Sequence, residues 1–212
     1  MSDAYRLYLV TDPRLGGDRP LEQIVEAAVA GGVTLVQLRD KDAEPAAVER
    51  RARSLLRLLD GTGVPLLVND HLSVAQTLGI GLHVGSSDSP PDLARTLLGP
   101  DVLIGASLGG GRAMPEAHWE ALSYAAVGPV WATQTKRDTG PAVGTEAVER
   151  VTGSLALPVV AIGGITPARA RSAVLAGAAG VAVVSDIVAA ADPAAAAREL
   201  REAVDAALAE RG

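Results

Sequence analysis

The chain alternates short apolar segments of strand length with longer segments whose apolar residues recur at helical spacing. Leu21, Ile24, Val25 and Ala28, for example, follow the i, i+3, i+4, i+7 spacing of one helix face. The short segments are rich in Val, Leu and Ile at successive positions, which is typical of parallel strands buried on both faces. We therefore predict eight strands, at residues 6–11, 34–39, 65–69, 81–84, 102–106, 124–127, 158–162 and 180–184.

The segments between the predicted strands carry helix signals. Thr166 and Asp192 are each followed by proline, the pattern of a capping side chain with proline at the first helical position. Residues 115–122 carry the faintest helical pattern. Eight strand–helix units in 212 residues match a (β/α)₈ TIM barrel, with residues 1–212 as a single domain. A doubly wound open sheet is the alternative.

Polar residues follow the second predicted strand, at the point where barrel enzymes carry their chemistry. These residues are Gln37, Arg39 and Lys41. The two-residue period of a strand places Gln37 and Arg39 on the same face, so we expect both side chains to point into the barrel mouth. The alternative is an ordinary solvated strand end.

Carboxylates follow the next two predicted strands. Asn69 and Asp70 come after the third strand, and Asp88 comes after the fourth. Two carboxylates on neighbouring loops suit a hard cation such as Mg²⁺, whose other ligands are water and substrate phosphate. The alternative is that each aspartate caps the helix that follows it.

The segment 129–144 shows neither strand nor helix period. A loop of that length inside a compact domain is usually functional. Its Thr133, Thr135 and Lys136 can donate hydrogen bonds to phosphate oxygens.

The last two predicted strands end in small residues. Gly163 and Gly164 follow the seventh strand and Ser185 follows the eighth. Backbone N–H groups at these two positions form the phosphate site that barrels often build.

Composition narrows the class of ligand. With a net charge of −6 and an aromatic set of two Trp and three Tyr, the chain lacks the basic face and the stacking platforms of nucleic-acid binding. Its two lysines are nevertheless Lys41 and Lys136, and its one asparagine is Asn69. With Arg39 and Arg137 they make the barrel mouth locally basic, which predicts an anionic, diphosphate-bearing substrate bound through Mg²⁺.

Several classes are excluded or disfavoured. No cysteine is present, so disulfides, thiolate metal sites and cysteine nucleophiles are excluded, which fits the cytoplasm. The N-terminal residues lack the pattern of a signal peptide, and no uncharged run has the roughly 20 apolar residues of a spanning helix. We expect a soluble protein with small-molecule substrates and no nucleic-acid or membrane partner. A homo-oligomer is left open.

The three histidines show no catalytic pattern. His83, on the fourth predicted strand, is expected to be packed and hydrogen-bonded, and His71 and His118 are expected on helix surfaces. Neither a Ser/His/Asp order nor a zinc-ligand spacing is present.

Seven short motifs in chain order resemble the thiamine phosphate synthase family. They are YLVTD at 8–12, QLRDK at 37–41, ND at 69–70, HVGxxD at 83–88, GPVWATQTK at 128–136 with Gly144, AIGGI at 161–165 and VVS at 183–185. The combination of QLRxK and TxTK is specific, whereas AIGGI is shared with many phosphate-binding barrels. The resemblance covers nearly the whole chain.

The resemblance implies a transferase that joins hydroxymethylpyrimidine diphosphate to hydroxyethylthiazole phosphate by Mg²⁺-assisted dissociative substitution. It places the metal on Asp70 and Asp88, and catalysis on Arg39, Lys41, Ser107 and Lys136. The pyrimidine diphosphate would be bound by Gln37, Leu38, Arg39, Asp40, Lys41, Asn69, Ser107 and Lys136. The thiazole phosphate would be bound by Thr133, Gln134, Thr135, Gly164, Val184 and Ser185.

Two positions depart from the family pattern and keep alternatives open. Ser86 stands where the family usually has glutamine, and Gly109 stands where it usually has histidine. The sister thiazole tautomerases share the barrel and are expected to use that histidine, so Gly109 favours the synthase. A non-catalytic barrel that binds thiazole or pyrimidine phosphates is a second alternative. A metal-dependent epimerase is disfavoured because the histidines lie in unsuitable contexts.

Overall fold

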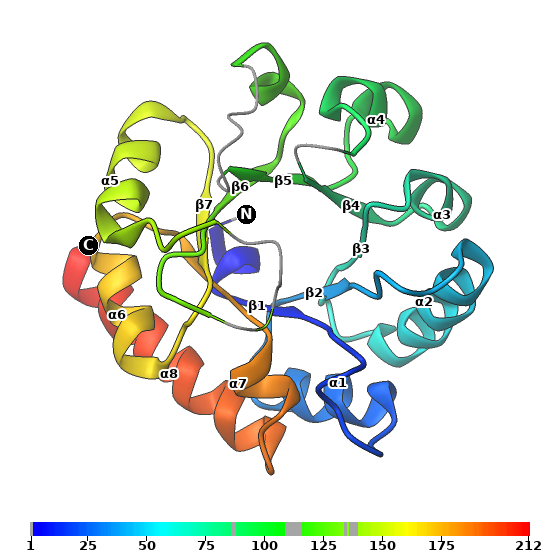
Figure 1. Cartoon of the computed structure of the whole chain (residues 1–212), viewed down its shortest axis with the longest axis horizontal. Helices are drawn as coiled ribbons and strands as arrows, with labels where there is room; N and C mark the ends of the chain where they lie inside the picture. Colours follow the sequence, from blue (N-terminus) through cyan, green and yellow to red (C-terminus); the bar gives the residue numbers. More distant parts are fainter. Residues whose placement is uncertain (1, 86–87, 109–115, 134, 136–139) are drawn as a thin grey trace.

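A computed structural model describes residues 2–85, 88–108, 116–133, 135 and 140–212. Eight parallel strands hydrogen-bond in chain order and the eighth pairs with the first, so the sheet closes into a barrel (Figure 1). Closure confirms the predicted TIM barrel and rules out the open doubly wound sheet. The strands are β1 (Leu7–Val10), β2 (Leu35–Leu38), β3 (Leu66–Asn69), β4 (Gly81–Val84), β5 (Ile104–Leu108), β6 (Tyr124–Val127), β7 (Val159–Ile162) and β8 (Gly180–Val183).

One strand is displaced from its predicted place. β5 begins and ends two residues later than the apolar run at 102–106 indicates. The reason is pairing, because Ser107 and Leu108 continue the ladder opposite Ala126 and Val127 of β6. The displacement brings Ser107 to the carboxyl end of the strand, where barrels place their functional side chains.

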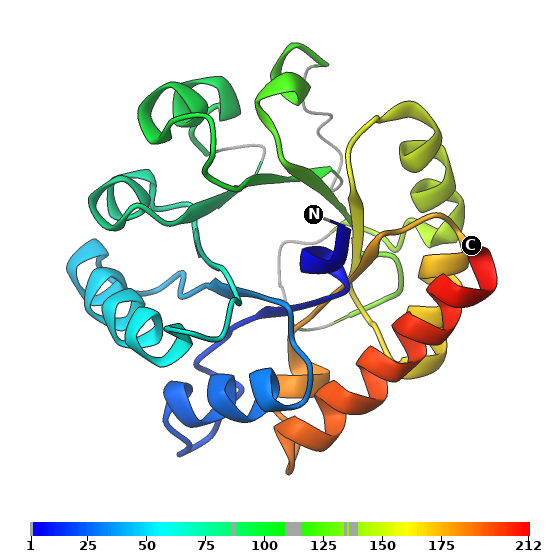
Figure 2. The same cartoon turned by 180° about the vertical axis from the view of Figure 1, so that it is seen from behind.

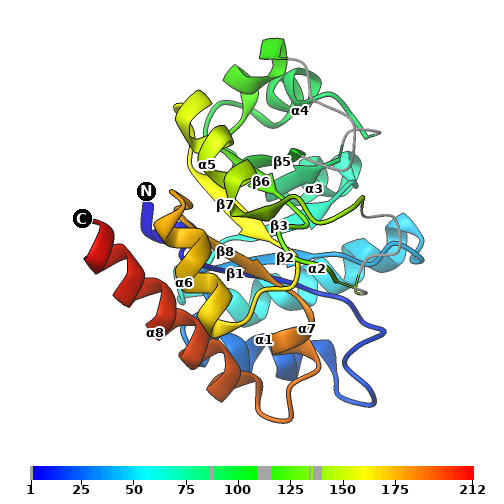
Figure 3. The same cartoon turned by 60° about the vertical axis from the view of Figure 1, so that its left-hand side comes forward.

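Helices surround the barrel (Figure 3). The segment predicted as a helix at 115–122 contains a 3₁₀-helix, η2 (Glu116–Ala121), and Pro115 lies outside the described residues. Among the described residues, none of the helices has the length and apolar character needed to cross a bilayer. The helices are η1 (Ser2–Tyr5), α1 (Leu21–Ala30), α2 (Pro45–Leu59), α3 (Leu72–Leu78), α4 (Pro91–Leu98), η2, α5 (Gly144–Ser154), α6 (Pro167–Leu175), α7 (Ser185–Val188) and α8 (Pro193–Arg211).

The two predicted helix caps are present. The Thr166 side chain accepts a hydrogen bond from the backbone N–H of Arg169 at the start of α6. The Asp192 carboxylate accepts two, each at 3.0 Å, from Ala194 and Ala195 at the start of α8. Both helices carry proline in their first turn, where its missing N–H costs nothing.

Apolar residues form two layers. One layer lies between the strands and the surrounding helices, and the other fills the barrel interior. Strand residues alternate between the two layers, so every strand is buried on both faces. The interior layer is unusual in that Tyr8 and Tyr124 carry much of its bulk in a chain without phenylalanine. Glycine at position 105 makes room, because a Cβ there would collide with the Tyr124 ring.

The amino-terminal end of the barrel is covered by η1 (Figure 2). Tyr5 at the end of η1 is buried, and its ring centroid lies 5.1 Å from that of Tyr124. Because this end is closed, ligands must enter from the carboxyl ends of the strands.

Candidate active site

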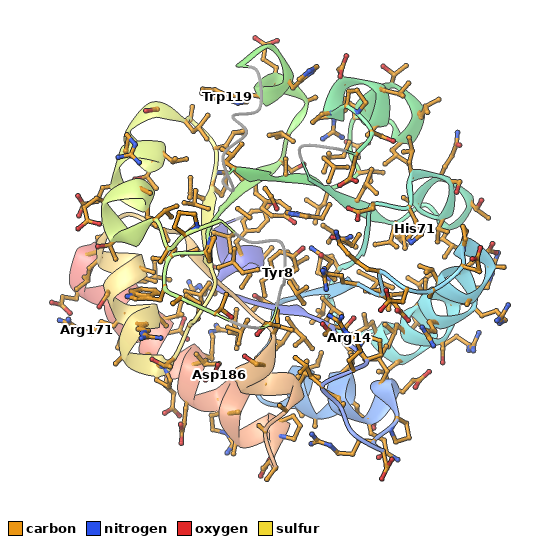
Figure 4. All side chains as sticks on the ribbon, viewed as in Figure 1. Tyr8, Arg14, His71, Trp119, Arg171 and Asp186 are labelled. Atoms are coloured by element: carbon orange, nitrogen blue, oxygen red, sulfur yellow. The ribbon has the colours of Figure 1, made fainter. Side chains whose placement is uncertain are left out.

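A cavity of about 310 Å³ opens at the carboxyl ends of the strands. The side chains around it come from the ends of all eight strands and from the loops that follow them (Figure 4). Of the sequence-predicted site residues, the cavity brings together Gln37, Arg39, Lys41, Asn69, Asp70, Asp88, Ser107, Thr133, Thr135, Gly164, Val184 and Ser185. Gln134 and Lys136, together with Ser86 and Gly109, lie outside the described residues.

Two predicted site residues point away from the cavity. Leu38 is buried between β2 and the surrounding helices, because the strand period that turns Gln37 inward turns its neighbour outward. The Asp40 carboxylate forms a close ion pair with Arg51 of α2. Neither side chain lines the cavity in the described part of the chain. The motif therefore supplies its cavity side chains from alternate positions.

Of the two cations among the described lining residues, Arg39 is the more buried, with its side chain 12% exposed against 45% for Lys41. Its backbone N–H donates to the Thr11 hydroxyl at 3.0 Å, and its guanidinium lies 3.6 Å from the Asp12 carboxylate. Burial lowers the pKa of Arg39, and the Asp12 charge opposes that shift. Arginine remains protonated at any physiological pH, so the site holds a poorly solvated positive charge that favours an anionic ligand.

Asp12 is a residue that sequence reasoning missed. It lies two residues after the end of β1, is 1% exposed, and accepts hydrogen bonds at 2.6 and 2.9 Å from the Arg14 guanidinium. Burial alone would raise its pKa, but the hydrogen bonds from Arg14 hold that pKa below its usual value. Asp12 is therefore a fixed anion that orients Arg39. The available signal was its place as the last residue of the YLVTD motif.

Asp70 and Asp88 form an acidic pair on the loops after β3 and β4. Burial and the adjacent Asp88 carboxyl raise the pKa of Asp70 to about 6, and Lys41, whose Nζ is 4.0 Å away, opposes the shift. Asp88 is held in place by the backbone N–H of Gly85, which donates to it at 2.6 Å. Two crowded carboxyls are the arrangement that a divalent cation stabilises.

The helix-capping alternative for these aspartates is wrong. The N-cap of α3 is His71 and that of α4 is Pro90, and neither helix has a side-chain cap hydrogen bond. Within the described ranges, no group of three or more His, Cys, Asp or Glu residues could hold a metal ion. A two-carboxylate site fits Mg²⁺, because this ion keeps several waters and takes further ligands from substrate phosphates.

The opposite side of the cavity carries hydroxyl groups and glycine. The Thr133 and Thr135 hydroxyls lie 3.2 Å apart, and the Thr135 hydroxyl donates to that of Ser185 at 3.4 Å. Gly163 and Gly164 adopt φ angles of 100° and 65°, a region that favours glycine. This side therefore offers hydroxyl donors and closely approachable backbone to a phosphate group.

Asp186 also lines the cavity, beside Ser185 at the start of α7 (Figure 4), and sequence reasoning missed it. The Ser185 hydroxyl donates to its carboxylate at 3.5 Å. Burial raises the pKa of Asp186, and the Ser185 hydrogen bond and Arg169 oppose that shift. A single acidic residue at the start of this helix carries no motif signature, so the sequence offered no signal for it.

The structure agrees with part of what the sequence predicts for the three histidines. His83 is buried and hydrogen-bonded on both ring nitrogens, at 2.8 Å to Tyr124 and 2.9 Å to Ser107, as expected. It also lines the cavity, which was not expected. His118 lies in η2 with its Nδ1 3.0 Å from Asp92, and His71 precedes α3 at the half-buried N-cap position.

A TIM barrel with such a cavity at the carboxyl ends of its strands has the architecture of an enzyme that acts on phosphorylated small molecules. The family model for thiamine monophosphate synthase matches residues 7–187. The chain therefore belongs to that family and is a transferase of thiamine biosynthesis.

Relatives that match nearly the full length of the chain support the same family. A thiamine-phosphate synthase of Azorhizobium caulinodans is 45% identical over 200 residues and covers 94% of each chain. One from Xanthobacter autotrophicus is 47% identical over 202 residues, covering 95% of this chain and 96% of its own.

Solved structures share the fold. A thiamine phosphate pyrophosphorylase from Pyrococcus furiosus superposes with a TM-score of 0.85 at 31% identity, covering 98% of both chains. A chain of the Amycolatopsis orientalis BexX/CysO complex, at 18% identity and a TM-score of 0.65 over 98% of this chain and 91% of its own, shows the fold alone.

Proposed function

We propose that the protein joins hydroxymethylpyrimidine diphosphate to hydroxyethylthiazole phosphate, giving thiamine phosphate and pyrophosphate. The observation that carries the proposal is the division of one cavity into two unlike sides. The cations Arg39 and Lys41 and the paired carboxylates of Asp70 and Asp88 lie after β2, β3 and β4. Hydroxyls and glycines lie after β6, β7 and β8, and among the described residues Asp186 is the single carboxylate beside them. A metal-bound diphosphate suits the first side and a phosphate monoester suits the second.

The proposed reaction needs neither a covalent intermediate nor a general base. The bond between the pyrimidine methylene carbon and the diphosphate oxygen breaks, and its electron pair leaves with pyrophosphate. The methylene carbon is then transiently cationic until the lone pair of the thiazole nitrogen forms the new C–N bond. Mg²⁺ held by Asp70 and Asp88 would supply positive charge that stabilises the departing pyrophosphate.

The chain's own cations would act on the same leaving group. We assign Arg39 and Lys41 to the diphosphate oxygens, because both line the side of the cavity that carries Asp70 and Asp88, and Arg39 is poorly solvated. We assign Lys136 to the diphosphate oxygens as well. Gln37, Asn69 and Ser107 are assigned to the rest of the pyrimidine diphosphate. Leu38 and Asp40 could contribute backbone groups only, because their side chains pack elsewhere.

The second substrate would bind on the hydroxyl side. We assign its phosphate to Thr133, Thr135 and Ser185, with the backbone at Gly164 and Val184. Gln134 remains part of the proposal as a neighbour of these threonines. The proposed cytoplasmic location and any homo-oligomer stay predictions.

An end-point assay tests the proposal. The protein is incubated with both substrates and Mg²⁺, thiamine phosphate is followed by mass spectrometry, and a chelator serves as the control. Metal-dependent product is the expected result, and Asp70→Ala should abolish it. Absence of product from the wild-type protein would overturn the proposal.

The same samples separate the two alternatives. A non-catalytic binder should give no product, and its melting temperature should rise with thiazole phosphate in the wild type and in Asp70→Ala alike. A tautomerase should instead convert a carboxylated thiazole phosphate without needing the pyrimidine diphosphate.

A further inference from the structure

A continuous line of hydrogen-bonded side chains crosses the barrel interior beneath the cavity. The Gln37 Nε2 amide donates to the Tyr8 hydroxyl, which lies 2.8 Å from the Tyr124 hydroxyl. That hydroxyl lies 2.8 Å from Nδ1 of His83, whose Nε2 is 2.9 Å from the Ser107 hydroxyl. The line joins β2, β1, β6, β4 and β5, and its two end residues both line the cavity.

With the nitrogen of the Gln37 amide facing Tyr8, the donors and acceptors along this line run in one direction. Each tyrosine hydroxyl has a single hydrogen to donate, and burial raises the pKa of Tyr8 and Tyr124, so both stay protonated. Two groups lie at the Tyr8 hydroxyl, the Tyr124 hydroxyl and the Gln37 amide, and the amide nitrogen that faces Tyr8 can only donate. With this amide orientation, the Tyr8 hydrogen goes to the Tyr124 hydroxyl.

The remaining two bonds follow from the first. The Tyr124 hydroxyl accepts from Tyr8, so its own hydrogen goes to Nδ1 of His83. A neutral histidine that accepts at Nδ1 carries its hydrogen at Nε2, and this hydrogen donates to the Ser107 hydroxyl oxygen. The Ser107 hydrogen is then free to turn toward the cavity.

We propose that Tyr8 and Tyr124 are positioning residues that hold His83 in its Nε2–H tautomer, and that Ser107 thereby becomes a hydrogen-bond donor to the substrate. The proposal rests on the proposed function, because the group that accepts from Ser107 belongs to the pyrimidine diphosphate. A fixed O–H donor aimed at a leaving oxygen stabilises the charge that develops there. An averaged tautomer would present Ser107 as an acceptor for part of the time, which repels an anionic oxygen.

The wild-type tautomer is the first measurement. Two-bond ¹H–¹⁵N spectra distinguish Nδ1–H from Nε2–H rings, and a chain with three histidines gives a simple spectrum. Resonances of His83 are assigned by comparison with His71→Gln and His118→Gln, both outside the barrel interior. A single Nε2–H form of His83 is expected. An Nδ1–H form, or an average of the two, would overturn the proposal.

Tyr124→Phe then breaks the line at its middle. We expect its His83 spectrum to lose the fixed Nε2–H form and kcat to fall about tenfold, the effect of one lost transition-state hydrogen bond, with KM nearly unchanged. Tyr5→Phe is the matched control, because its ring packs on Tyr124 while its hydroxyl bonds the Ser123 carbonyl outside the line. The control should keep both the tautomer and kcat.

The two readouts separate this inference from the proposed function. Tautomers are measured in the free protein, so the wild-type spectrum decides the inference even where Tyr124→Phe fails to fold. A wild-type tautomer of Nε2–H in a protein that makes no product would refute the proposed reaction and leave the hydrogen-bond line standing. A Tyr124→Phe variant with the wild-type tautomer and kcat would overturn the inference.

Discussion

At the scale of one residue, Asp70 has both an uncommon backbone conformation and a carboxyl group with a raised pKa. Its φ angle is 65°, in the left-handed region, and its carboxyl group is partly buried beside Asp88. Asparagine and aspartate tolerate this backbone better than other residues with a Cβ. An aspartate that only capped a helix would have its pKa lowered by the N–H groups it bonds, whereas that of Asp70 is raised to about 6.

The raised pKa predicts how Asp70→Asn changes stability. Between the usual value of 3.8 and about 6, the folded state binds more protons than the unfolded state, so Asp70 makes stability fall as pH rises. The full penalty is present at pH 7.5. Asp70→Asn should therefore raise the metal-free Tm at pH 7.5 by roughly 2–5 °C and much less at pH 4. Thermal melts at the two pH values measure this difference.

Magnesium supplies the control for that experiment. Mg²⁺ should raise the Tm of the wild-type protein at pH 7.5, because it binds the folded state alone, and should leave that of Asp70→Asn unchanged. Two results would contradict the assignment of Asp70 and Asp88 to a metal. One is a metal-free Tm of Asp70→Asn below that of the wild type at pH 7.5, and the other is a Tm of Asp70→Asn that still rises with Mg²⁺.

Arg39 leads to a second prediction at the residue scale. Its guanidinium is poorly solvated and faces the proposed diphosphate, so Arg39→Ala should lower kcat/KM about 10²- to 10³-fold. The fold should persist, because Asp12 keeps its ion pair with Arg14. Steady-state kinetics and circular dichroism measure the two effects. Arg53→Ala is the control, since Arg53 is exposed on α2 and pairs with Glu49, and its kinetics should match the wild type.

At the scale of elements, two loops are packed so closely that one of them requires glycine. The loop after β6 continues along β7, where the backbone N–H of Val130 donates to Ile162 and that of Trp131 donates to Gly163. A Cβ at Gly163 would lie 2.6 Å from the Pro129 Cα, and the φ of Gly163 is 100°. These loops carry the hydroxyl side of the cavity, so their contact sets its shape.

Gly163→Ala should therefore affect both stability and the second substrate. Steric overlap and an unfavourable φ should cost about 1–3 kcal/mol and raise the KM for thiazole phosphate more than that for the pyrimidine diphosphate. Calorimetry and two-substrate kinetics measure the two effects. Gly153→Ala in α5 has open space around its Cβ, so its Tm should equal or exceed that of the wild type. Equal KM increases for both substrates would argue against a divided cavity.

At the scale of the whole molecule, the barrel was readable from the sequence because of its parallel strands. Strands buried on both faces appear as continuous apolar runs, so all eight could be located before the structure. The side chains at their ends could be placed as well, because period two and barrel geometry send Gln37 and Arg39 inward.

The contacts that the sequence did not predict depend on the register between strands that are distant in the chain. The pairing of β1 with β2 sets Asp12 beside Arg39, and the size of Gly105 admits Tyr124 to the interior. Such contacts leave no local pattern in the chain. The structure also shows that Leu38 and Asp40, taken as site residues with their motif, have side chains committed to packing and to an ion pair.

Closure of the barrel links its first and last elements, and this link leads to the last prediction. Asp205 of α8 accepts from Arg6 at 2.8 Å beside β1 and from Arg201 at 2.8 Å on its own helix. These residues hold α8 against the chain start, and the described cavity lining includes none of them. Asp205→Ala should therefore lower Tm by roughly 2–4 °C and leave kcat/KM within twofold of the wild type.

The control for Asp205 lies on the same helix. Glu202 is exposed on α8, so Glu202→Ala should change neither Tm nor kinetics. Melting curves and kinetics of the two variants, measured below the lower Tm, separate stability from activity. If Asp205→Ala loses turnover at a temperature where it is fully folded, then the closing helix must act on the geometry of the strand ends, and stability and catalysis would be coupled through the barrel itself.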